Sequence, residues 1–250
     1  MKVKNFSDVI SNHNYNYILY KKTNSTMIKA RNFLKKNNSN FIINADEQSK
    51  GKGRHGNSWH SNKGNIFLSI GVSNNLNLQD YFLYNLITLI SVKKVLNIFG
   101  SKKIKFKWPN DLYFDNLKFG WIIIESCQSL NKINFAIIGI GLNFSSSPNL
   151  LKYKTTHIKD FCEINSKDIF LSYFFKFFFL NIKKYKKINQ NMILEYKKSL
   201  MFLNKEIKVK VGQNKLLKGI FIDISNDGSL ILKTKNKLFS LYSGSILWLL

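Results

Sequence analysis

Residues 48–59 read Gln-Ser-Lys-Gly-Lys-Gly-Arg-His-Gly-Asn-Ser-Trp, a stretch in which three glycines alternate with basic side chains. Glycine allows backbone conformations that other residues avoid, and it lets a ligand approach the main chain closely. Lysine and arginine can hold a phosphate or carboxylate at such a place. The stretch therefore predicts an anion-binding loop, and the simpler alternative is a flexible basic hairpin.

The glycine spacing in this loop also fits the dinucleotide-binding fingerprint Gly-x-Gly-x-x-Gly. That fingerprint requires a strand before it, a helix after it and an acidic residue about 20 positions later. Residues 41–45 predict the preceding strand, but residues 65–72 predict a second strand, and no carboxylate occurs before Asp80. A glycine loop that joins two strands is a different structure, so a Rossmann-type domain is excluded.

Two helices are predicted on either side of this strand pair. Residues 17–20 predict a short strand, and the Thr-Asn-Ser-Thr cluster at 23–26 predicts an N-cap for a helix whose apolar stripe ends at Leu34. The hydroxyl and N–H groups of such a cap can also bind a ligand. Residues 78–99 carry apolar side chains at helical spacing on more than one side, and Gly100 follows them, which predicts a long buried helix.

The run Lys107-Trp108-Pro109-Asn110-Asp111 interrupts an alternating pattern over residues 104–114. Pro109 breaks the strand, so we expect Asn110 and Asp111 in a turn. Both are common turn residues. The run nevertheless gathers a cation, an indole, an amide and a carboxylate at one strand end, where functional sites are often built.

Two further strands carry unusual residues. Lys118 lies in the returning strand 117–125, which is otherwise largely apolar, so its amine either reaches water or faces an anion. Strand 135–144 has Gly139 and Gly141 on one face. Glycines at such positions indicate that another group approaches the sheet closely there.

The pattern changes at about residue 204, after helices predicted over 167–187 and 190–202. Short strands separated by turns then follow, at 206–211, 216–224, 229–233, 238–242 and 246–249. The sequence therefore predicts an α+β fold. Residues 1–203 would form a mixed β-sheet domain packed with helices, and residues 204–250 would form a small SH3-like β-barrel.

Length and composition exclude several other classes. A chain of 250 residues is long enough for one domain and a small second one. Cys127 and Cys162 show neither metal-ligand nor disulfide spacing, which favours a reducing, cytoplasmic compartment. The N-terminus lacks the apolar core of a signal peptide. The apolar run 170–182 is shorter than the ~20 residues that span a bilayer, so it predicts a buried helix and no membrane partner is expected.

The net charge of +25 raises the question of nucleic-acid binding. The lysines are scattered instead of forming one block, and Lys, Asn and Ile are abundant throughout, which favours compositional drift. Arginine occurs only at Arg31 and Arg54. In so lysine-rich a chain, Arg54 within the glycine loop indicates a need for the planar guanidinium.

Taken in chain order, these motifs resemble those of the biotin–protein ligases, whose catalytic domain is class II synthetase-like. Trp108-Pro109-Asn110-Asp111, followed by Lys118 and Gly120, is the most specific element. The other matching parts are Asn24-Ser25-Thr26-Met27, the loop from Gln48 to Trp59, Gly139-Ile140-Gly141-Leu142-Asn143 and the SH3-like tail.

The resemblance implies a two-step ATP-dependent ligase. Biotin and ATP would give biotinyl-5'-AMP and pyrophosphate, and the biotinyl group would then pass to a lysine of a biotin carboxyl carrier protein, a subunit of acetyl-CoA carboxylase. Mg²⁺ would bind to the ATP phosphates and not in a protein cage, so no metal-ligating residues are expected.

The same resemblance assigns roles to individual residues. Lys118 would neutralise the carboxylate and later polarise its carbonyl, Arg54 would hold the phosphate, and Asp111 would orient the incoming amine or take its proton. The residues expected to bind biotin are Ser25, Thr26, Met27, Gln48, Gly51, Lys52, Gly53, Arg54, Lys118 and Gly120. Those expected to bind the nucleotide are Arg54, Trp59, Lys107, Asn110 and Asn143.

The chain also departs from the family pattern. The family's loop often reads Gly-Arg-Gly-Arg-Arg-Gly, whereas Lys52 and His55 stand at two of the arginine positions here, which predicts looser retention of the adenylate. About 15 residues precede the first predicted strand, so we expect a ligase without an N-terminal DNA-binding domain and without specific DNA binding. The family often forms a homodimer, for which the sequence carries no independent signal.

Three alternatives remain at this point. A lipoate–protein ligase would share the fold and the two-step logic, but the Trp-Pro-Asn-Asp run and the SH3-like tail favour biotin. A non-catalytic basic protein that binds nucleic acid would show clustered basic and aromatic residues, and it leaves the glycine loop unexplained. A biotin-binding sensor without catalysis is disfavoured by Arg54, Lys118 and Asp111.

Overall fold

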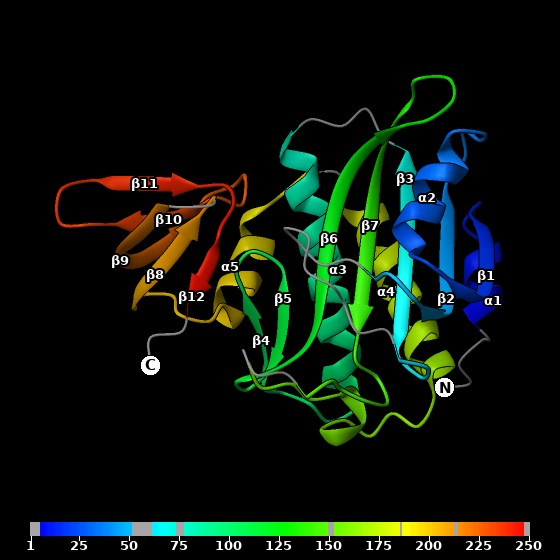
Figure 1. Ribbon diagram of the computed structural model, residues 1–250, viewed down its shortest axis with the longest axis horizontal. Coiled ribbons are helices and arrows are strands. Elements are labelled where there is room, and N and C mark those ends of the chain that lie inside the picture. The colour runs from blue at the N-terminus through cyan, green and yellow to red at the C-terminus, as the bar shows by residue number, and fades with distance from the viewer. Residues whose placement is uncertain are drawn as a thin grey trace.

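The computed structural model describes residues 6–51, 62–73, 78–149, 153–185, 187–212 and 215–247 (Figure 1). These residues form two sheets. The larger is a seven-stranded sheet in the order β1-β2-β3-β7-β6-β5-β4, and the smaller is a five-stranded antiparallel sheet at the C-terminal end of the chain. The predicted α+β fold with a mixed sheet is confirmed, because β1 and β2 are parallel and all other neighbours in the large sheet are antiparallel.

The large sheet contains the central motifs of the sequence. Its strands are β1 (Asn16–Thr23), β2 (Phe41–Gln48), β3 (Ile66–Ser73), β4 (Ile104–Lys107), β5 (Asp111–Phe114), β6 (Leu117–Gln128) and β7 (Asn134–Leu142). The predicted strand at 41–45 extends to Gln48, so β2 ends directly before the glycine loop. Asp111 is the first residue of β5, whereas the sequence placed it in the turn.

The two faces of the large sheet are covered by different helices, and the alternation of side chains along each strand explains why. On β2, Phe41 and Ile43 pack with α2 (Thr26–Leu34), whereas Ile42 belongs to the larger core on the other face. That core is covered by α3 (Leu78–Ile98), α4 (Lys167–Lys184) and α5 (Gln190–Ser199). Figure 1 shows α2 in front of the sheet and α3 and α4 behind it.

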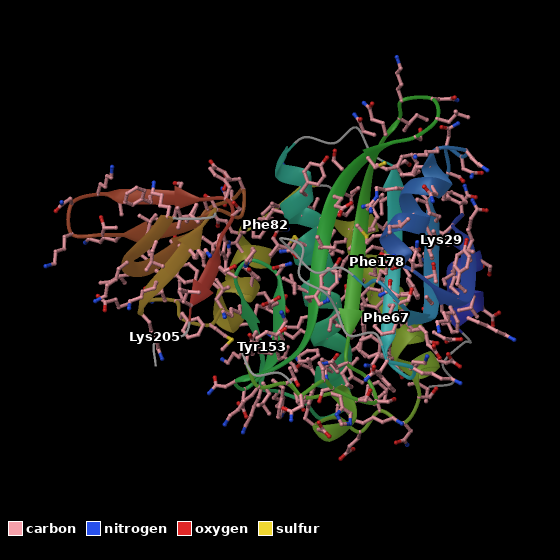
Figure 2. The ribbon with its side chains drawn as sticks, viewed as in Figure 1. Lys29, Phe67, Phe82, Tyr153, Phe178 and Lys205 are labelled. Atoms are coloured by element: carbon pink, nitrogen blue, oxygen red, sulfur yellow. The ribbon has the colours of Figure 1, made fainter. Side chains whose placement is uncertain are left out.

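The apolar run near residue 175 is a buried helix, as predicted. Phe174, Phe175 and Phe178 of α4 are fully buried, and Figure 2 labels Phe178 together with Phe67 of β3. No helix in the part of the chain that the structure describes is long and apolar enough to cross a membrane. A short helix, α1 (Phe6–Ser11), was not predicted from the sequence; it packs against α4.

The C-terminal strands form the second sheet in the order β11-β10-β9-β8-β12. Their bounds are β8 (Glu206–Val211), β9 (Lys215–Ile224), β10 (Leu230–Lys233), β11 (Leu238–Leu241) and β12 (Ser245–Leu247). Figure 1 shows this sheet to one side of the large sheet, next to α5. Lys197 of α5 forms an ion pair with Asp223 of β9, which ties the two parts together. The domain boundary at residues 203 and 204 stays a prediction.

Candidate active site

One row of residues crosses the large sheet and connects most of the sequence motifs. In the strand register, Lys107 of β4 lies opposite Asp111 of β5, and Asp111 lies opposite Trp121 of β6. Trp121 lies opposite Gly141 of β7, which lies opposite Phe67 of β3. Directly opposed residues point to the same face of a sheet. The row therefore places the Lys107 and Asp111 side chains on the same face as the β7 glycines.

A pocket opens on this face beside the N-terminus of α2. It is a small hollow, and the empty space in and around it amounts to about 240 Å³ with open solvent included. Its lining residues are Ser25, Thr26, Met27, Gln48, Leu68, Trp121, Gly139, Ile140 and Gly141. Four residues expected to bind the acid (Ser25, Thr26, Met27 and Gln48) are thus brought together, from a helix and a strand end that lie far apart in the sequence.

Gly139 of β7 makes room for Met27 of α2, and the sequence indicated such a close approach to this strand. A Cβ on Gly139 would lie 2.7 Å from the sulfur of Met27 and 2.8 Å from a methyl carbon of Ile123. Real Cβ atoms essentially never approach other atoms so closely, so a larger residue would force the Met27 and Ile123 side chains to shift. Gly120 has a different neighbourhood, because its Cβ would meet Leu142 at 2.5 Å and the Gly141 carbonyl oxygen at 3.0 Å. Gly120 therefore serves close packing between β6 and β7.

The N-terminus of α2 is capped in a way that the sequence did not predict. Ser25 occupies the N-cap position, but its hydroxyl makes no capping hydrogen bond. Gln48 Oε1 instead accepts hydrogen bonds from the Thr26 backbone N–H (2.7 Å) and the Thr26 hydroxyl (3.2 Å). The hydroxyl of Ser69 on β3 donates to the Thr26 hydroxyl at 2.9 Å. Gln48 thus holds the helix end in place and leaves the Ser25 hydroxyl at the pocket.

The chain after Gln48 stays beside the pocket. The backbone N–H of Ser49 donates to the Thr23 carbonyl at 2.9 Å, and that of Lys50 donates to the Asn24 carbonyl at 2.8 Å. Gly51 is buried. The remaining loop residues for which roles were predicted lie outside the described residues: Lys52, Gly53, Arg54, His55, Gly56 and Trp59.

Lys118 and Asp111 form an ion pair next to the row. The Lys118 amine lies 2.8 Å from an Asp111 carboxylate oxygen, and the Lys118 side chain is only 12% exposed. The same amine lies 5.3 Å from the centre of the Tyr153 ring. The sequence left open whether Lys118 reaches water or faces an anion, and in the structure it faces a carboxylate.

Lys107 completes a group of two lysines and one aspartate. Burial lowers the pKa of Lys107 to about 8; the nearby Asp111 carboxylate opposes this shift and the Lys118 charge adds to it. Its amine lies 5.9 Å from the centre of the Tyr113 ring. Such a lysine loses its proton more readily than an exposed one, and an anion bound beside it would favour the charged form.

The two asparagines assigned to the nucleotide differ in their surroundings. The Asn110 side-chain amide donates to the Ile122 carbonyl, and the Ile122 N–H donates back to the Asn110 carbonyl at 2.9 Å, so Asn110 fixes the turn before β5. Asn143 is 1% exposed and donates to the Thr156 carbonyl at 3.1 Å. Its Oδ1 has no hydrogen-bond partner among the described residues.

Sequence reasoning missed several pocket residues. Leu68, Ile140 and Trp121 line the pocket, although no binding role was predicted for them. Trp121 faces the pocket because it lies opposite Gly141, a pairing that the sequence alone does not give. Ser69 could not have been found from the sequence either, since its contact with Thr26 depends on how α2 packs on β3.

The fold is the one that solved biotin protein ligases share. The biotin protein ligase from Aquifex aeolicus, solved in complex with biotin and ATP, aligns with a TM-score of 0.76 and 25% sequence identity, over 92% of this chain and 97% of that chain. Residues 17–143 match the Biotin/lipoate A/B protein ligase family, and residues 202–247 match the Biotin protein ligase C terminal domain. The chain belongs to the biotin/lipoate A/B protein ligase family.

Two further relatives match over smaller shares of this chain. The Bifunctional ligase/repressor BirA of Bacillus subtilis is 28% identical over 136 residues, which are 53% of this chain and 42% of that protein. The match therefore spans less than half the length of that relative. The biotin–[acetyl-CoA-carboxylase] ligase of Mycobacterium tuberculosis is 23% identical over 215 residues, covering 83% of this chain and 79% of that protein.

Proposed function

We propose that this protein activates biotin with ATP and transfers the biotinyl group to a lysine of a biotin carboxyl carrier protein. The observation that supports this most strongly is the cross-sheet row. It sets a pocket lined by hydroxyl, amide and glycine groups beside the charged side chains of Lys107, Asp111 and Lys118. A small apolar acid would occupy the pocket with its carboxylate toward these charges.

The first step brings two anions together. A carboxylate oxygen of biotin attacks the α-phosphorus of ATP, an O–P bond forms, and the bond to pyrophosphate breaks with its electron pair leaving on pyrophosphate. Lys118 would neutralise the carboxylate, and Lys107 would stabilise phosphate charge on the nucleotide. Arg54 and the Gly51–Gly56 loop would hold the phosphate and keep water away from the product. Mg²⁺ would accompany the ATP phosphates.

The second step forms the amide. The lysine amine of the carrier attacks the carbonyl carbon of biotinyl-5'-AMP, a C–N bond forms, and AMP leaves with the electron pair of the C–O bond. Lys118 would polarise the carbonyl, and Asp111 would orient the amine and accept its proton. The carrier would be the acetyl-CoA carboxylase subunit, in line with the name of the mycobacterial relative.

The residues that line the pocket would bind the acid, and Asn143 would bind the nucleotide. Ser25 and Gln48 would hydrogen-bond biotin, and the start of α2 at Thr26 and Met27 would close over it. Asn143 would direct its Oδ1, for which the described part of the chain offers no hydrogen-bond partner, toward the nucleotide. We also propose a cytoplasmic location, for which the two free cysteines are the supporting observation, and we expect no specific DNA binding.

ATP–pyrophosphate exchange tests the first step. The assay compares biotin, lipoate and no acid with the native chain, Lys118→Ala and Lys103→Ala. Lys103 is a suitable control because it forms an exposed ion pair with Asp115, at the end of the β4–β5 hairpin away from Lys107 and Asp111. We expect exchange only with biotin, loss of at least about a hundredfold in Lys118→Ala, and native exchange in Lys103→Ala. Exchange with lipoate alone would assign the chain to lipoate activation. Absence of exchange with both acids, or equal exchange in the sample without an acid, would refute acid activation.

A further inference from the structure

The C-terminal sheet touches the large sheet at the most specific motif of the sequence. The indole N–H of Trp108 donates a hydrogen bond to the Gly228 carbonyl at 3.0 Å. Trp108 is 2% exposed, and it directly follows Lys107 in the chain. The residue next to a proposed phosphate-binding lysine is therefore held by the backbone of the C-terminal part.

Gly228 lies in the turn between β9 and β10, and two features of the structure require a glycine at this position. Its φ is +84°, a conformation that other residues adopt with strain, and a Cβ would lie 2.4 Å from the ring of Phe82 on α3. Figure 2 shows Phe82 where α3 faces the C-terminal sheet. The turn is braced from within, because the Gly228 N–H donates to the Ser225 carbonyl at 3.0 Å.

The large domain holds the next residue of the motif from the other side. The Pro109 carbonyl accepts hydrogen bonds from the side-chain amide of Asn85 on α3 (3.1 Å) and from the hydroxyl of Tyr196 on α5 (3.5 Å). Two helices and the C-terminal turn thus fix consecutive residues of the segment between β4 and β5. Lys107 ends β4 and Asp111 begins β5, so this segment sets the separation of their side chains.

We propose that Gly228, acting through Trp108, is a positioning residue for nucleotide binding. The C-terminal domain would serve the first step by holding Lys107 in place, and not by contacting ATP through this turn. Asp111 is fixed independently by β6, through its ion pair with Lys118 and the hydrogen bonds between Asn110 and Ile122. This inference rests on the proposed function. It predicts an effect confined to the nucleotide, because the acid pocket is built from α2, β2, β3, β6 and β7 and none of its lining residues belongs to this junction.

The test measures exchange kinetics for the native chain, Trp108→Phe and Gly228→Ala, with Gly212→Ala as the matched control. Trp108→Phe removes the N–H donor and keeps an aromatic ring. Gly212 also has a positive φ (+61°) in the C-terminal domain, but no atom of the residues that the structure describes lies within 4 Å of its Cβ position, so it controls for the loss of a turn glycine. We expect KM for ATP to rise about tenfold in both junction variants, with KM for biotin and the control unchanged.

A merely structural role would give a different result. It would lower the fraction of folded enzyme, so kcat would fall while both KM values stayed native, and that outcome would overturn the inference. Equal rises in both KM values would also overturn it, because the effect would not be confined to the nucleotide.

A binding measurement separates this inference from the proposed function. Titration calorimetry of Mg-ATP into the same four full-length proteins needs no catalysis. Weaker ATP binding by Trp108→Phe and Gly228→Ala than by the native chain and Gly212→Ala supports positioning, even if biotin-dependent exchange is absent. Equal affinity in all four proteins, or no ATP binding by the native chain, overturns it.

Discussion

Replacing Lys107 by methionine should stabilise the protein at neutral pH, although it should weaken the proposed ATP binding. Lys107 is more buried than an ammonium group favours, and this desolvation lowers its pKa from an ordinary value of 10.5 to about 8. Methionine fills a similar volume without a charge. The native chain therefore loses free energy of unfolding through the desolvation of the charged Lys107 amine, and the methionine variant does not.

The sign and size of this cost follow from proton linkage. Between the folded pKa of about 8 and the ordinary 10.5, the unfolded chain binds more protons at Lys107 than the folded chain. The cost is fully present below the folded value, and the free energy of unfolding rises as the pH passes through this window. At 1.36 kcal/mol per pKa unit, the native chain should gain about 2 to 3 kcal/mol from about pH 7 to about pH 10 through this group.

Urea denaturation across this pH range measures the effect as a difference between proteins. The stability advantage of Lys107→Met over the native chain should shrink by about 2 to 3 kcal/mol as the pH rises. Lys105→Met is the control, because Lys105 lies on the same strand and is exposed. A stability difference between Lys107→Met and the native chain that stays constant with pH, or that grows, would refute the reasoning.

Three other predictions concern the pocket and the loop. Gly139→Ala should raise KM for biotin in the exchange assay at least about tenfold, because the new methyl group would displace Met27, and an unchanged KM would count against the pocket. Gln48→Ala should lower the free energy of unfolding by about 1 kcal/mol through loss of the acceptor for Thr26, whereas Gln48→Glu keeps an acceptor and should not. Lys52→Arg should lengthen the half-life of the bound adenylate, measured by its release from the enzyme; no difference would refute looser retention.

Most strands and helices could be predicted because their apolar patterns are strong. The alternation in Glu206–Val211 and the dense apolar spacing in Leu78–Ile98 both correspond to elements with nearly the predicted bounds. The short helix Phe6–Ser11 was missed, since six residues carry too little periodicity and its contact is with α4, far along the chain.

The candidate site was predictable in its parts but not in its arrangement. Glycines on one face of β7 and a lysine in an apolar strand were visible in the sequence. Their alignment depends on register: a bulge between Leu112 and Tyr113 shifts the pairing of β5 with β6, so Lys118 reaches Asp111 although Trp121 is the residue opposite Asp111. The strand alternation alone does not reveal such a bulge.

Capping shows a second limit of local reasoning. The Ser/Thr cluster before α2 is a typical N-cap sequence, yet the acceptor for the Thr26 N–H comes from Gln48 at the end of β2. The same helix end could be satisfied locally or by a residue 22 positions away, and only the packing of α2 on the sheet decides between them.

The pairing of Lys118 with Asp111 gives Asp111 opposite effects on the two proposed steps. Lys118 is largely buried, so its charge needs a counter-ion before any acid arrives, and Asp111 supplies one at 2.8 Å. An incoming carboxylate must then compete with Asp111 for the same amine, which weakens binding in the first step. In the second step the acid is a mixed anhydride without a free carboxylate, so Asp111 no longer competes with it for Lys118. Asp111 would then stay paired with Lys118 and use its other carboxylate oxygen to accept the proton of the attacking amine. The residue that restrains activation is thus the one that would promote transfer.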